Sequence, residues 1–187
     1  GRPCEPLPCV VDVDPRDVAG IDRSFLGLPE EAFLVGLVFD ASSAIERKNP
    51  LGAIRAIAKA FGGRTDVVVV LKVTNGARRP FASAVDEATG LLRQSGLRYV
   101  LVTRLLTKHE TLGLIGSLDL CVSLHRSEGF GYTLAEAMAL GVPALATRYS
   151  GNLDFMSDEN SWLVSCREVL VRRAEGPFRL GTVWAEP

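Results

Sequence analysis

Two patterns of apolar residues alternate along this chain of 187 residues. Short stretches in which nearly every residue is apolar are typical of strands buried on both faces, and they occur at residues 33–39, 67–73, 99–105, 120–124, 143–146 and 162–164. Apolar residues recur at helical spacing at residues 50–61, 81–95, 107–118 and 133–140, with a helical turn at 153–156. Strands that alternate with single helices form right-handed βαβ units. The sequence therefore predicts an α/β fold, a Rossmann-like doubly wound parallel sheet of about six strands.

Two helix starts carry residues that favour a boundary. Asn49 precedes Pro50, so we expect Asn49 to cap a helix whose first position is Pro50. The sequence Thr107-Lys108-His109-Glu110 reads as a capping box. Both boundaries agree with the helices predicted from apolar spacing.

Both ends of the chain lie outside the regular pattern. Residues 1–32 are predicted to form a leading strand at Val10–Val13 and a connector packed on the main domain. Residues 33–166 carry the alternating strands and helices and form the main domain, and residues 167–187 are predicted to be a loop-like, truncated tail. Because the chain begins at Gly1 rather than Met, we expect a fragment of a larger protein.

Composition and charge exclude several classes of protein. Apolar residues make up 47% and charged residues 23%, which is ordinary for a globular domain. The 21 Lys and Arg residues nearly balance the 22 Asp and Glu residues, so nucleic acid is not an expected partner. No apolar stretch approaches the roughly 18 residues of a membrane-spanning helix, and no signal peptide is recognisable.

The four cysteines are not spaced as metal ligands. Cys121 and Cys166 lie in apolar stretches and are predicted to be buried thiols. Cys4 and Cys9 lie in a proline-rich segment and could pair in air. We expect a reducing, cytoplasmic location, and peripheral membrane association of the parent protein stays open.

A pair of cations follows the first predicted strand of the main domain. Ligands of doubly wound sheets bind beyond the carboxyl ends of the strands, where the loop containing Arg47 and Lys48 should lie. Two cations just before a helix N-terminus suit a diphosphate group. The alternative is a pair of solvated side chains.

A glycine-containing turn lies between a predicted strand and helix further along the chain. Gly129 and Gly131 permit close approach of the backbone, and the following amides would face an anion at the helix start. Glu128 precedes the turn and could bind a sugar or stabilise developing positive charge. The alternative is an ordinary tight turn.

Glu136 lies in the predicted helix that follows this turn. A carboxylate there could accept hydrogen bonds from two ribose hydroxyls. However, Thr133-x-x-Glu136 also fits a capping box, in which Glu136 would only serve its own helix. Taken alone, the sequence favours the cap.

The segment Glu128-Gly129-Phe130-Gly131 followed by Glu136 resembles the signature of retaining glycosyltransferases of family 4. Three further segments resemble the same family, at residues 39–50, 123–127 and 147–155. Together the resemblance runs from about Gly27 to Val164. It implies the C-terminal, nucleotide-sugar-binding half of the glycosyltransferase-B fold, of the type found in bacterial polysaccharide synthesis.

The resemblance also implies a division of roles among the site residues. Arg47 and Lys48 would neutralise the diphosphate of a GDP- or UDP-linked sugar, Glu136 would bind the ribose, and Glu128 would be the catalytic residue at the donor sugar. Further donor contacts are implied for Ser43, Asn75, Arg104, His125, Gly129, Phe130, Gly131, Tyr132, Thr133 and Leu134. Asn75 and Arg104 would lie near the nucleoside. No metal and no other cofactor is implied.

Several of these residues have structural alternatives. A histidine at the end of an apolar strand, such as His125, is more often a buried structural residue. Asn75-Gly76 alone reads as a turn, and Ser42 and Ser43 could be helix caps.

The resemblance leaves out the half of the enzyme that binds the acceptor. An N-terminal acceptor-binding domain is therefore an expected partner, and this chain alone should bind the donor without efficient transfer. The predicted function is transfer of a hexose, with mannose as the suggested sugar, to a glycan or lipid-linked acceptor. A nucleotide-sugar epimerase and a non-catalytic nucleotide-sugar-binding module stay as alternatives.

Overall fold

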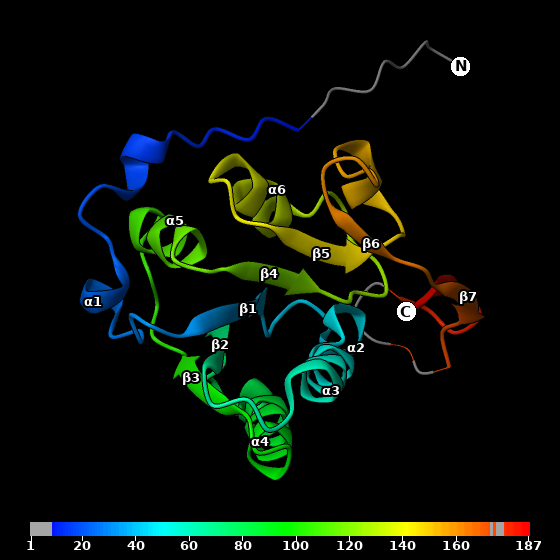
Figure 1. Cartoon of the computed structure of the whole chain (residues 1–187). Coiled ribbons are helices and arrows are strands. Elements are labelled where there is room, and N and C mark those ends of the chain that lie inside the picture. The colour runs from blue at the N-terminus through cyan, green and yellow to red at the C-terminus, as the bar shows by residue number, and fades with distance from the viewer. Residues whose placement is uncertain (1–8, 173, 175–177) are drawn as a thin grey trace.

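The computed structural model describes residues 9–172, 174 and 178–187. Its centre is a six-stranded sheet in the order β3-β2-β1-β4-β5-β6, and every neighbouring pair is parallel (Figure 1). The strands are β1 (Phe33–Asp40), β2 (Val67–Thr74), β3 (Arg98–Val102), β4 (Leu120–Ser123), β5 (Ala144–Thr147) and β6 (Trp162–Val164). This arrangement confirms the predicted doubly wound α/β fold.

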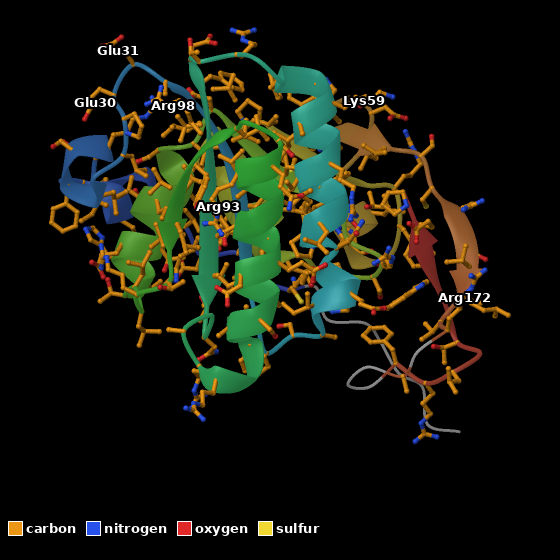
Figure 2. All side chains as sticks on the ribbon, turned by 90° about the horizontal axis from the view of Figure 1, so that it is seen from below. Glu30, Glu31, Lys59, Arg93, Arg98 and Arg172 are labelled. Atoms are coloured by element: carbon orange, nitrogen blue, oxygen red, sulfur yellow. The ribbon has the colours of Figure 1, made fainter. Side chains whose placement is uncertain are left out.

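Helices cover both faces of the sheet. Helices α3 (Pro50–Phe61) and α4 (Arg79–Gln94) lie on one face, and α5 (Lys108–Gly116) and α6 (Tyr132–Ala139) lie on the other (Figures 1 and 2). A hydrophobic core lies on each face of the sheet, and alternate side chains of β2 pack into the two cores. Val69 and Leu71 pack with α3 and α4, whereas Val68 and Val70 pack with α5. A strand buried on both faces has to be apolar throughout, which explains the continuous apolar runs.

Short helical segments lie at the connections. They are η1 (Pro15–Val18), α1 (Arg23–Leu26), α2 (Ile45–Lys48) and η2 (Gly151–Asp154). The turn predicted at 153–156 thus begins two residues earlier. Among the described residues, no helix has the length and apolar character needed to cross a membrane.

Asn49 lies at the predicted N-cap position of α3 but does not cap it. Its backbone is left-handed, with φ 50°, and its side chain makes no capping hydrogen bond. Its Nδ2 instead donates to the carbonyl oxygen of Leu124 at 2.8 Å. The prediction of a capping side chain was wrong, because the amide joins the corner between α2 and α3 to the end of β4.

Both ends of the chain differ from the prediction. Val10–Val13 forms no strand, because it pairs with no strand in the described part of the chain. The tail is not loop-like: β7 (Arg167–Leu170) and β8 (Val183–Glu186) pair as antiparallel strands. Trp184 of this hairpin is 5% exposed, and the guanidinium of Arg126 lies 5.4 Å from its ring centre. These contacts join distant segments, so no local pattern indicates them.

The thiols agree only in part with the prediction. Cys121 is buried as predicted, and burial raises its pKa to about 12. Cys166 is partly exposed, and its Sγ donates to the carbonyl oxygen of Arg148, so the prediction of a buried thiol was wrong. Cys9 is exposed, and Cys4 lies outside the described residues.

Candidate functional site

The order of the strands reverses between β1 and β4, and the loops after these two strands meet at their carboxyl ends. The amide of Arg126 donates to the carbonyl oxygen of Arg47 at 2.7 Å, and Asn49 adds its bond to Leu124. Segments almost 80 residues apart are therefore held together at the position where doubly wound sheets bind ligands.

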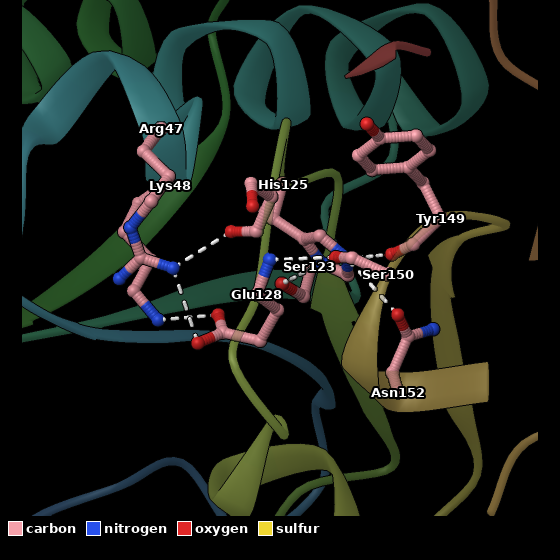
Figure 3. Close-up of polar contacts among 9 residues, drawn as sticks. Arg47, Lys48, Ser123, His125, Glu128, Tyr149, Ser150 and Asn152 are labelled. Atoms are coloured by element: carbon pink, nitrogen blue, oxygen red, sulfur yellow. Dashed lines mark hydrogen bonds and ion pairs between the residues drawn. The ribbon is translucent and has the colours of Figure 1, made fainter. Parts of the chain in front are cut away.

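Arg47 and Lys48 both point at the carboxylate of Glu128 (Figure 3). Arg47 Nη1 lies 3.1 Å from Oε1, and Lys48 Nζ lies 2.6 Å from Oε2. The Arg47 guanidinium also donates to the carbonyl oxygen of Ser127 at 2.7 Å. All three charged side chains are at most 18% exposed. The sequence indicated these residues for one site, and the structure adds that they pair directly.

The charges of this cluster are unequal. Burial raises the pKa of Glu128, but the charges and hydrogen bonds of Lys48 and Arg47 outweigh burial and hold that pKa below its usual value. Glu128 is therefore ionised at neutral pH. Two cations share one carboxylate in this cluster, so the cluster itself carries net positive charge that can attract an anion.

Lowering the pH should destabilise the fold through Glu128. Because its folded-state pKa lies below the ordinary 4.5, the stabilisation is complete above that value and is lost as the pH falls through the folded pKa. The midpoint of thermal unfolding, followed from about pH 7 to about pH 3, should fall more steeply for the wild type than for Glu128→Gln. Parallel curves for the two proteins would contradict this ion-pair assignment.

The N-terminus of α6 faces a cavity beside this cluster. Gly131 precedes the helix with φ 96°, a left-handed conformation that glycine adopts without strain. The amide of Leu134 donates to the carbonyl oxygen of Gly131 at 2.9 Å, whereas the amides of Tyr132 and Thr133 come before this first bond of the helix. The sequence led us to expect the amides that follow the turn to face an anion; that of Leu134 is engaged in the helix, and those of Tyr132 and Thr133 have no acceptor within the described residues.

The cavity itself is about 360 Å³ in volume. Residues from the ends of β1 and β4, the glycine turn and the start of α6 line it: Val38, Lys48, Cys121, Val122, Ser123, Glu128, Gly129, Phe130, Gly131, Tyr132, Thr133 and Leu134. The cation Lys48, the carboxylate Glu128 and the helix N-terminus thus share one space. This combination suits a ligand with both hydroxyl and phosphate groups.

The loop after β5 braces the glycine turn, a role that the sequence analysis did not find. The hydroxyl of Ser150 accepts from the amide of Glu128 at 2.8 Å, and the amide of Gly151 donates to the carbonyl oxygen of Glu128 at 3.1 Å. Gly151 packs so tightly that an added Cβ would lie 1.9 Å from the carbonyl oxygen of Gly129. The one local sign was a glycine in the loop that follows the strand predicted at residues 143–146.

Glu136 lies further along α6 than predicted and is not a cap. Gly131 occupies the N-cap position, and no side chain caps this helix. The capping-box interpretation is therefore wrong. Burial raises the pKa of Glu136, and the charge of Lys108, the first residue of α5, opposes that shift. A half-buried carboxylate with no hydrogen bond to the described part of the chain is free to accept one from a ligand.

His125 is completely buried, and both ring nitrogens have partners (Figure 3). Nδ1 lies 3.0 Å from the hydroxyl of Ser123, and Nε2 lies 3.1 Å from the carbonyl oxygen of Tyr149 and 3.2 Å from Oδ1 of Asn152. Because Nε2 faces two acceptors, it carries the proton, and Nδ1 accepts from Ser123. Burial lowers the pKa of His125. The geometry favours the structural alternative, and contact with a donor stays a prediction.

Three predicted residues lie around other loops of the same rim. Asn75 Nδ2 donates to both carboxylate oxygens of Asp40, at 3.0 and 3.1 Å. The amide of Ser43 donates to the carbonyl oxygen of Asp40, and Ser43 does not cap α2, which has Ala44 at its N-cap. Arg104 pairs with Glu110 at 2.7 Å. None of the three has a hydrogen bond or ion pair to the Glu128 cluster within the described ranges.

Acidic and metal-ligating residues do not gather in the described part of the chain: no group of three or more His, Cys, Asp or Glu could hold a metal ion there. One Asp-x-Asp sequence occurs, at Asp12-Val13-Asp14. Its second carboxylate caps η1 and pairs with Arg16. The structure accounts for Asp14 without a ligand.

A doubly wound sheet with paired cations and a helix N-terminus at its switch point is typical of domains that bind phosphate-containing ligands. Residues 37–173 match the family described as Glycosyl transferases group 1, and the chain belongs to that family. A comparison with proteins of curated function gave no match.

Solved structures share the fold at low identity. HepE of Anabaena, in complex with UDP and glucose, is 23% identical, with 82% of this chain and 39% of HepE covered and a TM-score of 0.62. The C-terminal domain of LpcC from Francisella tularensis, a group 1 glycosyl transferase, is 20% identical, with coverage of 82% and 80% and a TM-score of 0.65. The catalytic domain of the Helicobacter pylori cholesterol-α-glucosyltransferase is also 20% identical, with coverage of 71% and 76% and a TM-score of 0.54. The chain thus spans less than half the length of HepE.

Proposed function

We propose that this chain is the donor-binding domain of a retaining glycosyltransferase and binds the nucleoside diphosphate of a nucleotide sugar. The observation that carries the proposal is the convergence of Arg47 and Lys48 on Glu128, beside a cavity that Lys48, Glu128 and the N-terminus of α6 line. Family membership and the shared fold support it. Residues 33–166 form the donor domain in this proposal.

In this proposal the diphosphate replaces Glu128 as the ion-pair partner of Arg47 and Lys48. The anion lies between Arg47, Lys48 and the free amides at the start of α6, where the helix dipole also favours negative charge. The released carboxylate of Glu128 faces the donor sugar. Glu136 accepts hydrogen bonds from the ribose, because its own carboxylate lacks a partner among the described residues.

The same residues can stabilise the charges that develop when the diphosphate leaves the sugar. In retaining transfer the bond between the anomeric carbon and the diphosphate breaks, and negative charge develops on the leaving phosphate. Arg47 and Lys48 stabilise that charge, and Glu128 stabilises the positive charge that develops on the sugar. The cations do this without a metal ion. The new bond joins the anomeric carbon to the hydroxyl oxygen of the acceptor, the hydroxyl proton passes to the leaving diphosphate, and a separate acceptor-binding domain holds the acceptor.

The donor proposed here is a hexose linked to GDP or UDP. HepE binds UDP and UDP-glucose, and these compounds are the first to test. GDP-mannose is the second candidate, on resemblance within the family. The described cysteines are free thiols, which supports a reducing, cytoplasmic location.

Calorimetric titration of this chain with UDP, GDP, UDP-glucose and GDP-mannose, without added metal, tests the function. We expect one nucleotide series to bind, and we expect Glu136→Ala to lower its affinity about tenfold, since a charged acceptor of two hydroxyl donors is lost. Glu136→Gln keeps the volume and one acceptor and should lose less.

Thermal unfolding of the same variants separates binding from folding. Glu136 caps no helix, so Glu136→Ala should unfold within a few degrees of the wild type. An unfolded Glu136→Ala variant would argue for a structural role. No binding of any nucleotide by the folded wild-type chain would contradict the proposed function.

A further inference from the structure

Lys72 is a buried cation that the proposed function does not use. It lies in β2 between Leu71 and Val73, is 2% exposed, and is among the largest fully buried side chains that the structure describes. Lysine is almost never fully buried unless a partner compensates its charge. A position in the middle of an otherwise apolar strand therefore requires a reason.

The register of the sheet places Lys72 next to the proposed donor cavity. Lys72 is paired with Val38 of β1 on one side and with Val102 of β3 on the other. Val38 lines the cavity. Since Val68 and Val70 face α5, Lys72 belongs to that same face of β2. It therefore lies one strand away from the cavity, toward the loop between β3 and α5.

The ammonium group of Lys72 holds that loop. Nζ donates to the carbonyl oxygen of Arg104 at 3.0 Å, and this is its one hydrogen bond within the described residues. Arg104 lies two residues after β3, and its side chain pairs with Glu110 of α5. The carboxylate of Glu110 also accepts from the amide of Thr107 at 2.8 Å. The loop is thus fixed from α5 by Glu110 and from the sheet by Lys72.

Three neighbouring features act on the charge of Lys72, whose ammonium group anchors the loop. Burial and the neighbouring charge of Arg104 lower the pKa of Lys72, and the charge of Asp40 raises it. Asp40 itself is held by Asn75 and Ser42, so it is shared among several groups. The Arg104 carbonyl is the direct acceptor of the buried ammonium, and removal of the ammonium leaves the loop held from the α5 side alone.

We propose that Lys72 is a positioning residue that fixes the loop at residues 103–107 as the wall of the nucleoside end of the donor site. The inference rests on the proposed function, in which the diphosphate lies at Arg47 and Lys48 and the ribose at Glu136. The charge of Lys108, the residue that directly follows this loop, acts on Glu136, so the loop lies on the Glu136 side of the site. Lys72 contacts the loop rather than the diphosphate region. It therefore controls affinity for the nucleoside part of the ligand and leaves the affinity for the diphosphate part unchanged.

Titration with two probes tests this division. Lys72→Met keeps the length of the side chain and removes the donor, and it should lower the affinity for the bound nucleoside diphosphate about tenfold. Its affinity for inorganic diphosphate should stay within about twofold of the wild type. Lys72→Gln retains an N–H donor and should recover part of the nucleotide affinity. Lys59→Met, an exposed change on α3, is the matched control and should alter neither affinity.

Several outcomes would overturn the inference. Equal loss for both probes would show a general structural effect, and no loss for either probe would show that the anchor does not matter. If Lys72→Met fails to fold, Lys72→Gln carries the same comparison. If the wild-type chain binds inorganic diphosphate as tightly as a nucleoside diphosphate, the loop forms no wall for the nucleoside. That result overturns this inference and leaves the proposed function intact. A wild-type chain that binds neither probe overturns the proposed function as well.

Discussion

Replacing Arg47 and Lys48 together by alanine should lower the affinity for a nucleoside diphosphate at least about a hundredfold. Each cation contributes a charge-assisted hydrogen bond to the anion, and such bonds are worth about 1.5–3 kcal/mol. Two of them amount to about 3 kcal/mol or more, and each 1.4 kcal/mol is about a factor of ten in affinity. Calorimetric titration, or displacement of a fluorescent nucleotide, measures the loss.

The double variant should also lose stability, because Glu128 would keep its burial and lose both partners. A buried charge without its partners costs about 3–5 kcal/mol in comparable cases, less here because the carboxyl group can take up a proton. Adding Glu128→Gln to the double variant removes that charge. The triple variant should recover most of the lost stability and none of the nucleotide binding.

This pair of variants separates a binding role from a structural one. If the double variant binds nucleotide within about threefold of the wild type, the two cations do not hold the diphosphate. If the triple variant stays as unstable as the double variant, the ion pairs to Glu128 are not the cause of the lost stability.

Replacing Gly151 by alanine should disrupt the glycine turn from behind. The new Cβ would lie 1.9 Å from the carbonyl oxygen of Gly129 and 2.9 Å from the amide nitrogen of Phe130. Both are backbone atoms, so no change of rotamer relieves the clash, and the turn that carries Glu128 has to move. We expect a loss of about 2 kcal/mol in the free energy of unfolding and at least about tenfold weaker nucleotide binding.

Gly129→Ala is the matched control for this change. An added Cβ at Gly129 meets no atom within 4 Å, although Gly129 lies on the other side of the same contact. Its free energy of unfolding should stay within about 0.5 kcal/mol of the wild type, as measured by denaturant titration. Similar stability for Gly151→Ala would show that the loop after β5 does not brace the turn.

Apolar spacing predicted the strands and helices of the main domain because each strand is buried on both faces. A continuous apolar run such as Val67–Leu71 has few other solutions in an α/β chain. The hairpin of β7 and β8 was missed for the opposite reason. It is held by Trp184 against Arg126, and by the amide of Ala185, which donates to the carbonyl oxygen of Arg126 at 2.8 Å. Such contacts leave no periodic trace in the sequence.

Some features of the candidate site were also predictable from the sequence, and others were not. The residue types and their positions indicated Arg47, Lys48 and Glu128 at one rim, since the carboxyl ends of parallel strands meet there, and the family resemblance added Glu136. Spacing could not show whether Glu136 caps its helix. A Thr133–Glu136 capping box requires Thr133 at the N-cap position. In the structure Gly131 occupies that position and Tyr132 is the first residue of α6, so Thr133 already lies inside the helix.

The sequence by itself determined the fold class and the rim on which the charged residues lie, because these follow from burial patterns and strand direction, and the resemblance of its motifs indicated the family. The tertiary structure alone decided which partners those residues have. Glu128 pairs with both cations, His125 is enclosed by the loops after β4 and β5, and Lys72 reaches Arg104. Each of these contacts joins segments far apart in the chain, and its geometry depends on how the strands are ordered in the sheet.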